Sequence, residues 1–184
     1  FGGEDSNATN DAWTMDLTTQ SPTWNQVAKN GIKPPTRRGH SAVVYNGKMY
    51  VFGGKNNSRM NDVWELDLTT QSPTWNQVLT KGTKPPPRAG HSAVVYNDSM
   101  YVFGGQDGSN KKKQDLWQLD LTTNAWTEVT SGVTPPSART GHSVVVHSDS
   151  MYVFGGLDDS NLSTKKNDVW KFDLQIHLPI ILIL

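Results

Sequence analysis

Short runs of apolar and aromatic residues recur along the 184-residue chain, and polar segments rich in Gly, Ser, Thr, Asn and Pro separate them. No segment keeps the 3.6-residue apolar period of an amphipathic helix. Many short apolar runs joined by polar turns are typical of β-proteins. The pattern therefore predicts an all-β fold, in which the seven Trp residues supply much of the buried area.

The runs belong to a repeat with a period of 51 residues. Phe-Gly-Gly, Gly-His-Ser, Asp-x-Trp and a later Trp follow one another in a fixed order. These elements begin at Phe1, Phe52, Phe103 and Phe154, at Gly39, Gly90 and Gly141, at Asp11, Asp62, Asp115 and Asp168, and at Trp24, Trp75 and Trp126. One loop of the third copy is two residues longer and another is two residues shorter, so the period is restored. A fixed unit with adjustable loops indicates a structural repeat.

Each complete unit predicts four strands. The first strand follows Gly-His, the second leads into Gly-Gly, and the third and fourth each carry a Trp. The predicted ranges are 41–45, 49–52, 63–68 and 75–78 in one unit, and 92–96, 100–103, 116–121 and 126–129 in the next. Before them lie third and fourth strands at 12–17 and 24–27, and after them come 143–147, 151–154 and 169–174. Asn46-Gly47 and its equivalents predict tight hairpins between the first two strands.

The elements Arg-x-Gly-His-Ser, Tyr-Val-Phe-Gly-Gly and Asn-Asp-Val-Trp-x-Leu-Asp-Leu resemble the kelch repeat, as in the central domain of galactose oxidase. The resemblance implies blades of four antiparallel strands around a channel, with the first strand innermost. We expect a partial blade over 1–27, complete blades over 37–78 and 88–129, and an incomplete blade over 139–174. About three and a half blades make an arc of a larger propeller, or a protomer that must associate.

Residues 175–184 depart from the repeat, since an aliphatic run from Pro179 to Leu184 stands where a fourth strand with its Trp is expected. The run is too short to span a bilayer. Two interpretations remain open: it forms a substitute outer strand, or it is an unstructured end.

Composition narrows the function. The formal net charge is zero, which argues against general binding to nucleic acid or a membrane surface. The chain has no Cys, which excludes disulfides and thiolate chemistry and favours a reducing compartment such as the cytoplasm, while an extracellular location stays open.

The charges are unevenly distributed over the predicted unit. The connections from strand two to three and from strand four to the next strand one should share a face, and they hold 15 of the 17 basic but nine of the 17 acidic residues. These long loops are 4–11, 55–62, 106–115, 157–168, 28–38, 79–88 and 130–139. A net charge of +6 on this face predicts binding to an acidic protein or peptide segment. Ordinary solvated loop charge is the alternative.

Three arginines, Arg37, Arg88 and Arg139, stand at equivalent positions before strand one. Their guanidinium groups are suited to carboxylates, and the kelch resemblance implies that such arginines line a partner pocket. The alternative is a structural pair with a neighbouring blade. The first Asp of strand three in each unit is expected to cap or pair structurally. Arg59, Lys112 and Lys165 lie on the long loops and complete the predicted partner-binding set.

No catalytic, cofactor or metal site is predicted. His40, His91 and His142 repeat because the blade repeats, and on separate blades they are poorly placed to share one ion. Because of the kelch resemblance, two known kinds of kelch enzyme have to be considered. One kind needs a Cys, and the chain has none. The other needs the iron-binding motif Glu-x-x-x-Asp-x-x-x-His, and none of Glu4, Glu65 and Glu128 begins such a motif. We therefore expect a non-catalytic interaction scaffold. The alternative is a self-assembling propeller arc, or one associated with a carbohydrate-rich matrix.

Overall fold

The structure is a computed structural model that describes residues 1–4, 8–28, 31–130, 132, 134–159 and 165–175. Two complete antiparallel sheets have the strand orders β5-β6-β7-β8 and β10-β11-β13-β14. Their strands are β5 (Ser41–Tyr45), β6 (Lys48–Phe52), β7 (Val63–Asp67) and β8 (Trp75–Val78), then β10 (Ser92–Tyr96), β11 (Ser99–Phe103), β13 (Leu116–Asp120) and β14 (Ala125–Val129). The predicted all-β fold with four-stranded blades is confirmed.

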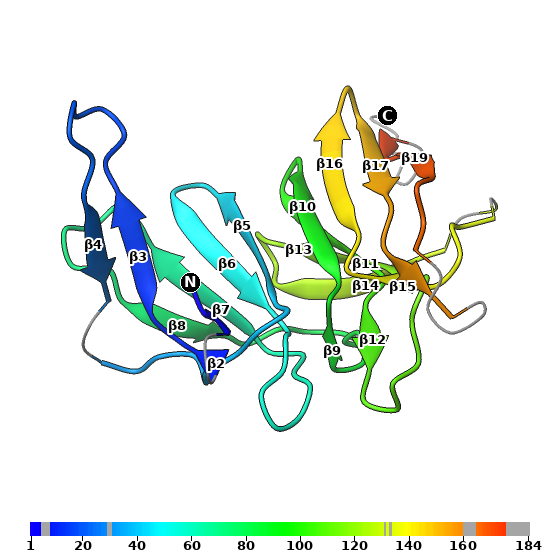
Figure 1. Cartoon of the computed structure of the whole chain (residues 1–184), viewed down its shortest axis with the longest axis horizontal. Coiled ribbons are helices and arrows are strands. Elements are labelled where there is room, and N and C mark those ends of the chain that lie inside the picture. Colours follow the sequence, from blue (N-terminus) through cyan, green and yellow to red (C-terminus); the bar gives the residue numbers. More distant parts are fainter. Residues whose placement is uncertain (5–7, 29–30, 131, 133, 160–164, 176–184) are drawn as a thin grey trace, which may run out of the picture.

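Two smaller sheets flank these blades in the described part of the chain. On one side β3 (Ala12–Met15) pairs with β4 (Trp24–Val27). On the other, β16 (Ser143–His147), β17 (Ser150–Phe154) and β19 (Val169–Asp173) form a three-stranded sheet. Figure 1 shows the four sheets side by side, from β3–β4 in blue to β16–β19 in yellow and red. We number the blades zero to three in this order.

In blades one to three the first two strands meet in a tight hairpin, as predicted. Asn46 and Gly47 have φ angles of 46° and 72°, and Ser148 and Asp149 have 44° and 61°. Two successive residues with positive φ give the type I′ geometry whose twist matches that of antiparallel strands.

Three hydrophobic cores lie between successive blades. One packs Ala12 of blade zero against Val51, Trp64, Leu66 and Trp75 of blade one. The second joins blades one and two, and the third joins blades two and three. Blades one and two are therefore covered on both faces, because alternate side chains of each strand enter different cores.

Phenylalanine, histidine and tryptophan make the same contacts at successive interfaces. The Phe of Phe-Gly-Gly in one blade meets the His that precedes strand one of the next, with ring centroids 5.3, 5.1 and 5.2 Å apart. Gly53 explains why glycine follows that Phe. A Cβ there would lie 2.9 Å from Cε1 of His91, and the φ of +62° already disfavours other residues.

Short strands within the long loops were not predicted. They are β1 (Gly3–Glu4), β2 (Ala8–Thr9), β9 (Arg88–Ala89), β12 (Gln106–Asp107), β15 (Arg139–Thr140) and β18 (Leu157–Asp158). β9 pairs with β12 and β15 with β18, so the segment before strand one is tied to the loop between strands two and three of its own blade. The long loops are consequently ordered by backbone hydrogen bonds.

The end of the chain is described as far as Gln175, and Leu174 is fully buried in the last core. The two interpretations of the aliphatic run concern residues 176–184, which lie outside the described residues. Within the described part, no helix is long and apolar enough to cross a membrane.

Candidate partner-binding face

The loops between strands two and three lie in a row on one side of the arc, at the lower edge in Figure 1. The segments before strand one run between them. The amide of Arg88 donates to Met60 O of the preceding blade at 3.0 Å, and β9 pairs with β12 of its own blade. Arg139 repeats this arrangement, since its amide donates to Lys113 O at 2.9 Å. We call loops 55–60, 106–113, 157–159 and 165–166 the loop row.

The three equivalent arginines lie beneath the loop row, with side chains that are 0% exposed. Arg88 donates from Nη1 and Nη2 to the two carboxylate oxygens of Asp115 at 2.7 and 2.8 Å, and from Nη1 to Gly104 O at 2.8 Å. Arg37 binds Asp62 and Gly53 in the same way, and Arg139 binds Asp168 and Gly155. Each guanidinium therefore joins the segment before strand one to the end of strand two and the start of strand three.

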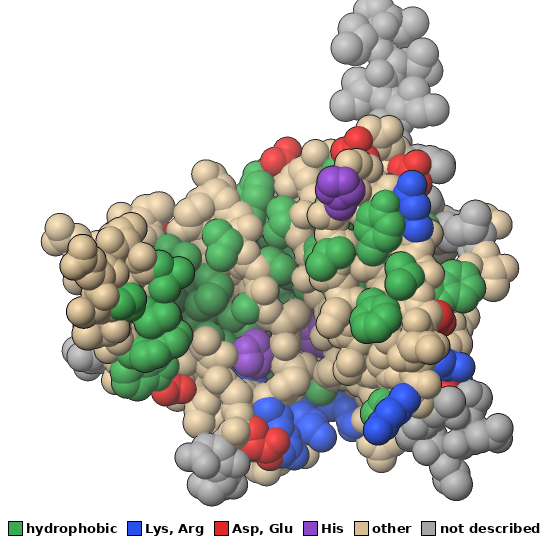
Figure 2. Space-filling view, turned by 45° about the horizontal axis from the view of Figure 1, so that its top comes forward, with side chains coloured by type: hydrophobic (Ala, Val, Ile, Leu, Met, Phe, Trp, Pro, Cys, Tyr) green, Lys and Arg blue, Asp and Glu red, His purple; other side chains and the backbone are tan. Residues whose placement is uncertain are grey.

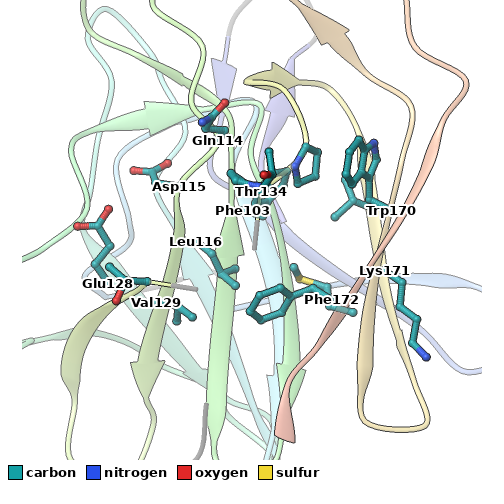
Figure 3. Close-up of a pocket in the computed structure, with 15 residues that line it drawn as sticks. Phe103, Gln114, Asp115, Leu116, Glu128, Val129, Thr134, Trp170, Lys171 and Phe172 are labelled. Carbon is teal, nitrogen blue, oxygen red and sulfur yellow. The ribbon is translucent and has the colours of Figure 1, made fainter. Parts of the chain in front are cut away.

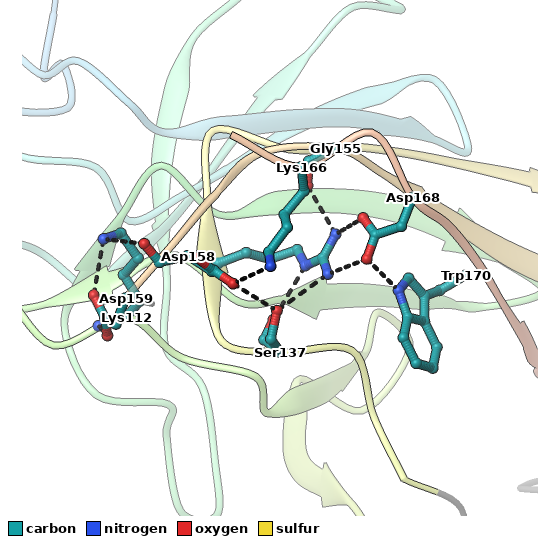
Figure 4. Close-up of polar contacts among 9 residues, drawn as sticks. Lys112, Ser137, Gly155, Asp158, Asp159, Lys166, Asp168 and Trp170 are labelled. Atoms are coloured by element: carbon teal, nitrogen blue, oxygen red, sulfur yellow. Dashed lines mark hydrogen bonds and ion pairs between the residues drawn. The ribbon is translucent and has the colours of Figure 1, made fainter. Parts of the chain in front are cut away.

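The aspartates of these pairs also accept a hydrogen bond from the Trp two residues later, for example Trp117 Nε1 to Asp115 at 2.8 Å. Burial raises the pKa of Asp115, but the hydrogen bonds and charge of Arg88 outweigh it and hold this pKa below its usual value. At Asp168, shown in Figure 4, the hydrogen bonds from Arg139 lower the pKa most. These hydrogen bonds are the kind of contact expected from aspartates with a structural role.

Arg37, Arg88 and Arg139 thus have all their charge satisfied inside their own blades in this structure. The geometry favours the structural alternative for them, with the difference that each pairs within its own blade and not with a neighbour. Their predicted contact with a partner stays a prediction that this conformation does not support.

Arg59 belongs to the loop row and is half-buried. Its Nη2 donates to Gln106 Oε1 at 2.7 Å and to Asn110 Oδ1 at 2.9 Å, both on the next blade's loop. These acceptors are uncharged, so they orient the guanidinium group without neutralising it.

Lys112 and Lys165 take different positions on the row. Lys112 is only 6% exposed, and its Nζ donates to Asp159 Oδ1 at 2.8 Å and to Asp158 O at 3.1 Å, so it joins two loops (Figure 4). Lys165 is exposed. Arg38 and Glu4 form a further ion pair between blades, beside the start of the row.

Ion pairs within the long loops determine which residues carry the basic excess of this face. At least seven acidic residues of the long loops form ion pairs with seven basic residues of the same loops. The excess therefore resides on other residues, which in the loop row include Lys55, Arg59, Lys111 and Lys165. Figure 2 shows the basic side chains gathered along this lower edge. Lys81 lies elsewhere, because its backbone bonds Asn124 and Trp126 at the outer strand of blade two.

The repeated histidines lie between blades and not on the loop row. Burial lowers the pKa of His91 to about 3, and those of His40 and His142 to about 4, so all three are neutral at pH 7. The described residues contain no group of three or more His, Asp or Glu side chains placed to hold a metal ion.

The FBX42 β-propeller domain is the family whose model matches residues 1–175 of this chain. The chain is also 36% identical to the leucine-zipper-like transcriptional regulator 1 homolog of Drosophila melanogaster, over 95% of this chain and 19% of that protein. It is 39% identical to human host cell factor 2, over 69% of this chain and 18% of that protein.

The chain belongs to the kelch-repeat β-propellers, in the family of the FBX42 propeller domain. The predicted kelch resemblance is therefore confirmed. The solved structure of YjhT has the same fold, with a TM-score of 0.75 and 20% identity over 95% of this chain and 62% of that one. The kelch segment spans less than a fifth of each of the two curated relatives.

Proposed function

We propose that this kelch segment is a non-catalytic protein-interaction module whose loop row binds an acidic segment of a partner protein. The observation that carries the proposal is the charge pairing of the row. Its aspartates are taken up by internal ion pairs, while Lys55, Arg59, Lys111 and Lys165 remain exposed or half-buried. A surface of one sign on a rigid scaffold attracts and orients ligands of the opposite sign.

Arg59 is the best candidate for direct recognition. Its side chain is already held by Gln106 and Asn110, so binding a carboxylate costs less side-chain entropy than it would for a free arginine. Lys165 would add charge at the far end of the row. Arg37, Arg88, Arg139 and Lys112 would act indirectly, by fixing the loops on which the exposed cations stand. A cytoplasmic setting remains a prediction from composition.

A matched pair of double variants tests the proposal. The probe is a fluorescein-labelled peptide of alternating Glu and Ser, with binding followed by anisotropy. We expect affinity to fall as salt rises, and Arg59→Gln with Lys165→Gln to weaken binding roughly fivefold. Lys48→Gln with Lys171→Gln removes the same charge outside the long loops and should leave affinity unchanged.

Lys165→Gln alone supports the interpretation, because its exposed side chain can be changed with little effect on the fold. Equal losses in the two double variants would mean that only net charge matters, and no binding at low salt would also reject the loop row as the site.

The second candidate function, self-association through open blade edges, has one supporting observation: Trp13 and Trp24 on β3–β4 are large, apolar and exposed. Sedimentation at several concentrations tests it, and a monomer at the highest concentration rejects it.

A further inference from the structure

The histidine that precedes strand one connects its blade to the preceding blade. His91 of blade two is 5% exposed, and its ring packs edge-on against that of Phe52 in blade one, with centroids 5.1 Å apart. Its Nε2 lies 3.2 Å from Phe52 O and 3.0 Å from Ser41 Oγ, both in blade one. A carbonyl oxygen can only accept a hydrogen bond, so this geometry assigns the proton of the neutral ring to Nε2.

A second proton on His91 is unfavourable while blades one and two stay in contact. It would go to Nδ1, which is buried and has no hydrogen-bond partner among the described residues. Burial is the largest cause that lowers the pKa of His91, to about 3. Three cationic or titratable groups act on the ring in the same direction: Arg88, His142 and His40. Arg88 is itself paired with Asp115, which weakens its effect.

The interface between blades two and three repeats this arrangement with one difference. His142 is 6% exposed and packs on Phe103, as His91 packs on Phe52. Phe52 also packs on Trp126, with ring centroids 5.1 Å apart. Phe103 instead lines a cavity of about 340 Å³ together with Leu116 (Figure 3). His91 therefore belongs to the more completely packed interface, and His142 is a second, independent case.

Backbone hydrogen bonds cross both interfaces beside these histidines. Between blades one and two, the amides of Gly54, Arg88 and Gly90 donate to Arg88 O, Met60 O and Gly39 O at 2.9, 3.0 and 2.8 Å. Between blades two and three, the amides of Gly105, Arg139 and Gly141 donate to Arg139 O, Lys113 O and Gly90 O at 2.8, 2.9 and 2.8 Å. We call these the first and second amide sets. Because the bonds break when the blades part, each set reports on one interface.

We propose that His91 and His142 make the blade interfaces acid-sensitive, so that protonation of each ring separates its blade from the preceding one. A ring released into water regains its ordinary pKa of 6.5 and binds a proton more readily than the buried ring. Each interface is therefore most stable above pH 6.5 and weakens as the pH falls toward 4. Separation of blades one and two also draws Arg59 away from Gln106 and Asn110, which divides the loop row whatever it binds.

Native-state hydrogen exchange of the unaltered chain between pH 6.5 and pH 4.5 tests the switch. After correction for the intrinsic exchange rate, protection of the first amide set should fall about tenfold per pH unit below pH 6. Amides inside β11 should lose less protection, because separation leaves the strands of one blade paired. The range lies above the ordinary pKa of aspartate, so the buried arginine–aspartate pairs stay ionised throughout.

Three variants assign the effect to individual rings. His91→Gln keeps a neutral N–H donor and should remove the pH dependence of the first amide set while leaving that of the second. His142→Gln should do the reverse. His147→Gln, at the exposed end of β16, is the control and should change neither set.

Three results would overturn the proposal. The first is protection of both amide sets that does not change with pH in the unaltered chain. The second is an equal loss of protection in the amide sets and inside β11, which would mean that acid unfolds the whole chain. The third is an unchanged pH dependence in the His91→Gln and His142→Gln variants. If one of these variants fails to fold, the other variant and the unaltered chain still decide the question.

Discussion

The arginine that precedes strand one is the clearest case of a single residue that organises a blade. The Arg88 guanidinium has no exposure, and its hydrogen bonds to Gly104 and Asp115 hold together three segments that are far apart in sequence. A buried charge is tolerated only when it is paired and hydrogen-bonded, and removing one partner leaves the other uncompensated. Blade zero lacks this contact in the described chain, since Asp11 bonds the Trp13 indole and meets no arginine there.

This difference between the blades predicts how much stability is lost when a single Asp is replaced by Asn. Asp115→Asn removes the charge that balances Arg88 and should lower the free energy of unfolding by roughly 3 kcal/mol. Asp11→Asn is the matched control at the equivalent repeat position, and it should cost less than about 1 kcal/mol. Urea denaturation followed by tryptophan fluorescence measures both. Similar losses in the two variants would show that the arginine pair is not what stabilises the blade.

The sequence revealed both members of this pair as repeated residues, but not that they pair within a blade. Arg37 and Asp62 are 25 residues apart, whereas Arg139 and Asp168 are 29 apart, because the loop between them changes length. Repetition alone is equally compatible with a ring of exposed guanidinium groups. The fold shows that in blades one to three the Arg side chain is enclosed by the Asp and by a carbonyl group of the Gly-Gly turn.

The fourth strand shows how strongly context determines the role of an element. β4 and β8 have the same sequence, Trp-Asn-Gln-Val. Trp75 in β8 packs on Phe1 and is 4% exposed, whereas Trp24 in β4 is 63% exposed, because no described blade lies before blade zero. Identical local sequences therefore contribute very different buried apolar areas.

Alanine substitution at these two positions should separate local from interblade effects. Trp75→Ala leaves a large cavity between blades zero and one and should lower the free energy of unfolding by roughly 3 to 5 kcal/mol. Trp24→Ala removes an exposed ring and should cost less than about 1 kcal/mol. Chemical denaturation of both variants in the same buffer is the measurement. A loss at Trp24 as large as that at Trp75 would mean that an unrecognised contact buries β4.

The first and second strands were predictable because they carry runs of apolar residues, as in Met49 to Phe52 and its copies, and the third and fourth strands because each carries a Trp that recurs in the repeat. The two-residue strands β9, β12, β15 and β18 were not. Gln106–Asp107 and Arg139–Thr140 have no apolar pattern, and tertiary pairing alone makes them extended. For the same reason the ordered arrangement of the loop row, with Arg59 held by the neighbouring loop, could not be derived from the charges.

At the scale of the whole molecule the described chain is an open arc in which each blade packs only on its neighbours. Within the described residues three cores join four sheets, and each outermost sheet has one face that no other described sheet covers. In blade three this face exposes Val145, Phe154 and Val169. The net charge of the loop face was predictable by counting, whereas the ion pairs that leave the basic excess on residues such as Arg59 and Lys165 were not.

Such an arc should not open as one unit. Blades one and two each bury both faces, while blade three buries one, so its local opening exposes less apolar surface and costs less free energy. Native-state hydrogen exchange at equivalent amides measures the difference. The amides of Leu66 and Leu119 should exchange more slowly than that of Phe172, which has the same position in β19. The dependence of these exchange rates on denaturant is a second measurement. Denaturant should change the exchange rate of the Phe172 amide little, because a local opening exposes little surface, and should accelerate exchange in blade one more strongly. Equal protection with equal denaturant dependence would instead mean that the arc unfolds cooperatively, and that the single core between blades two and three is sufficient to hold the last blade.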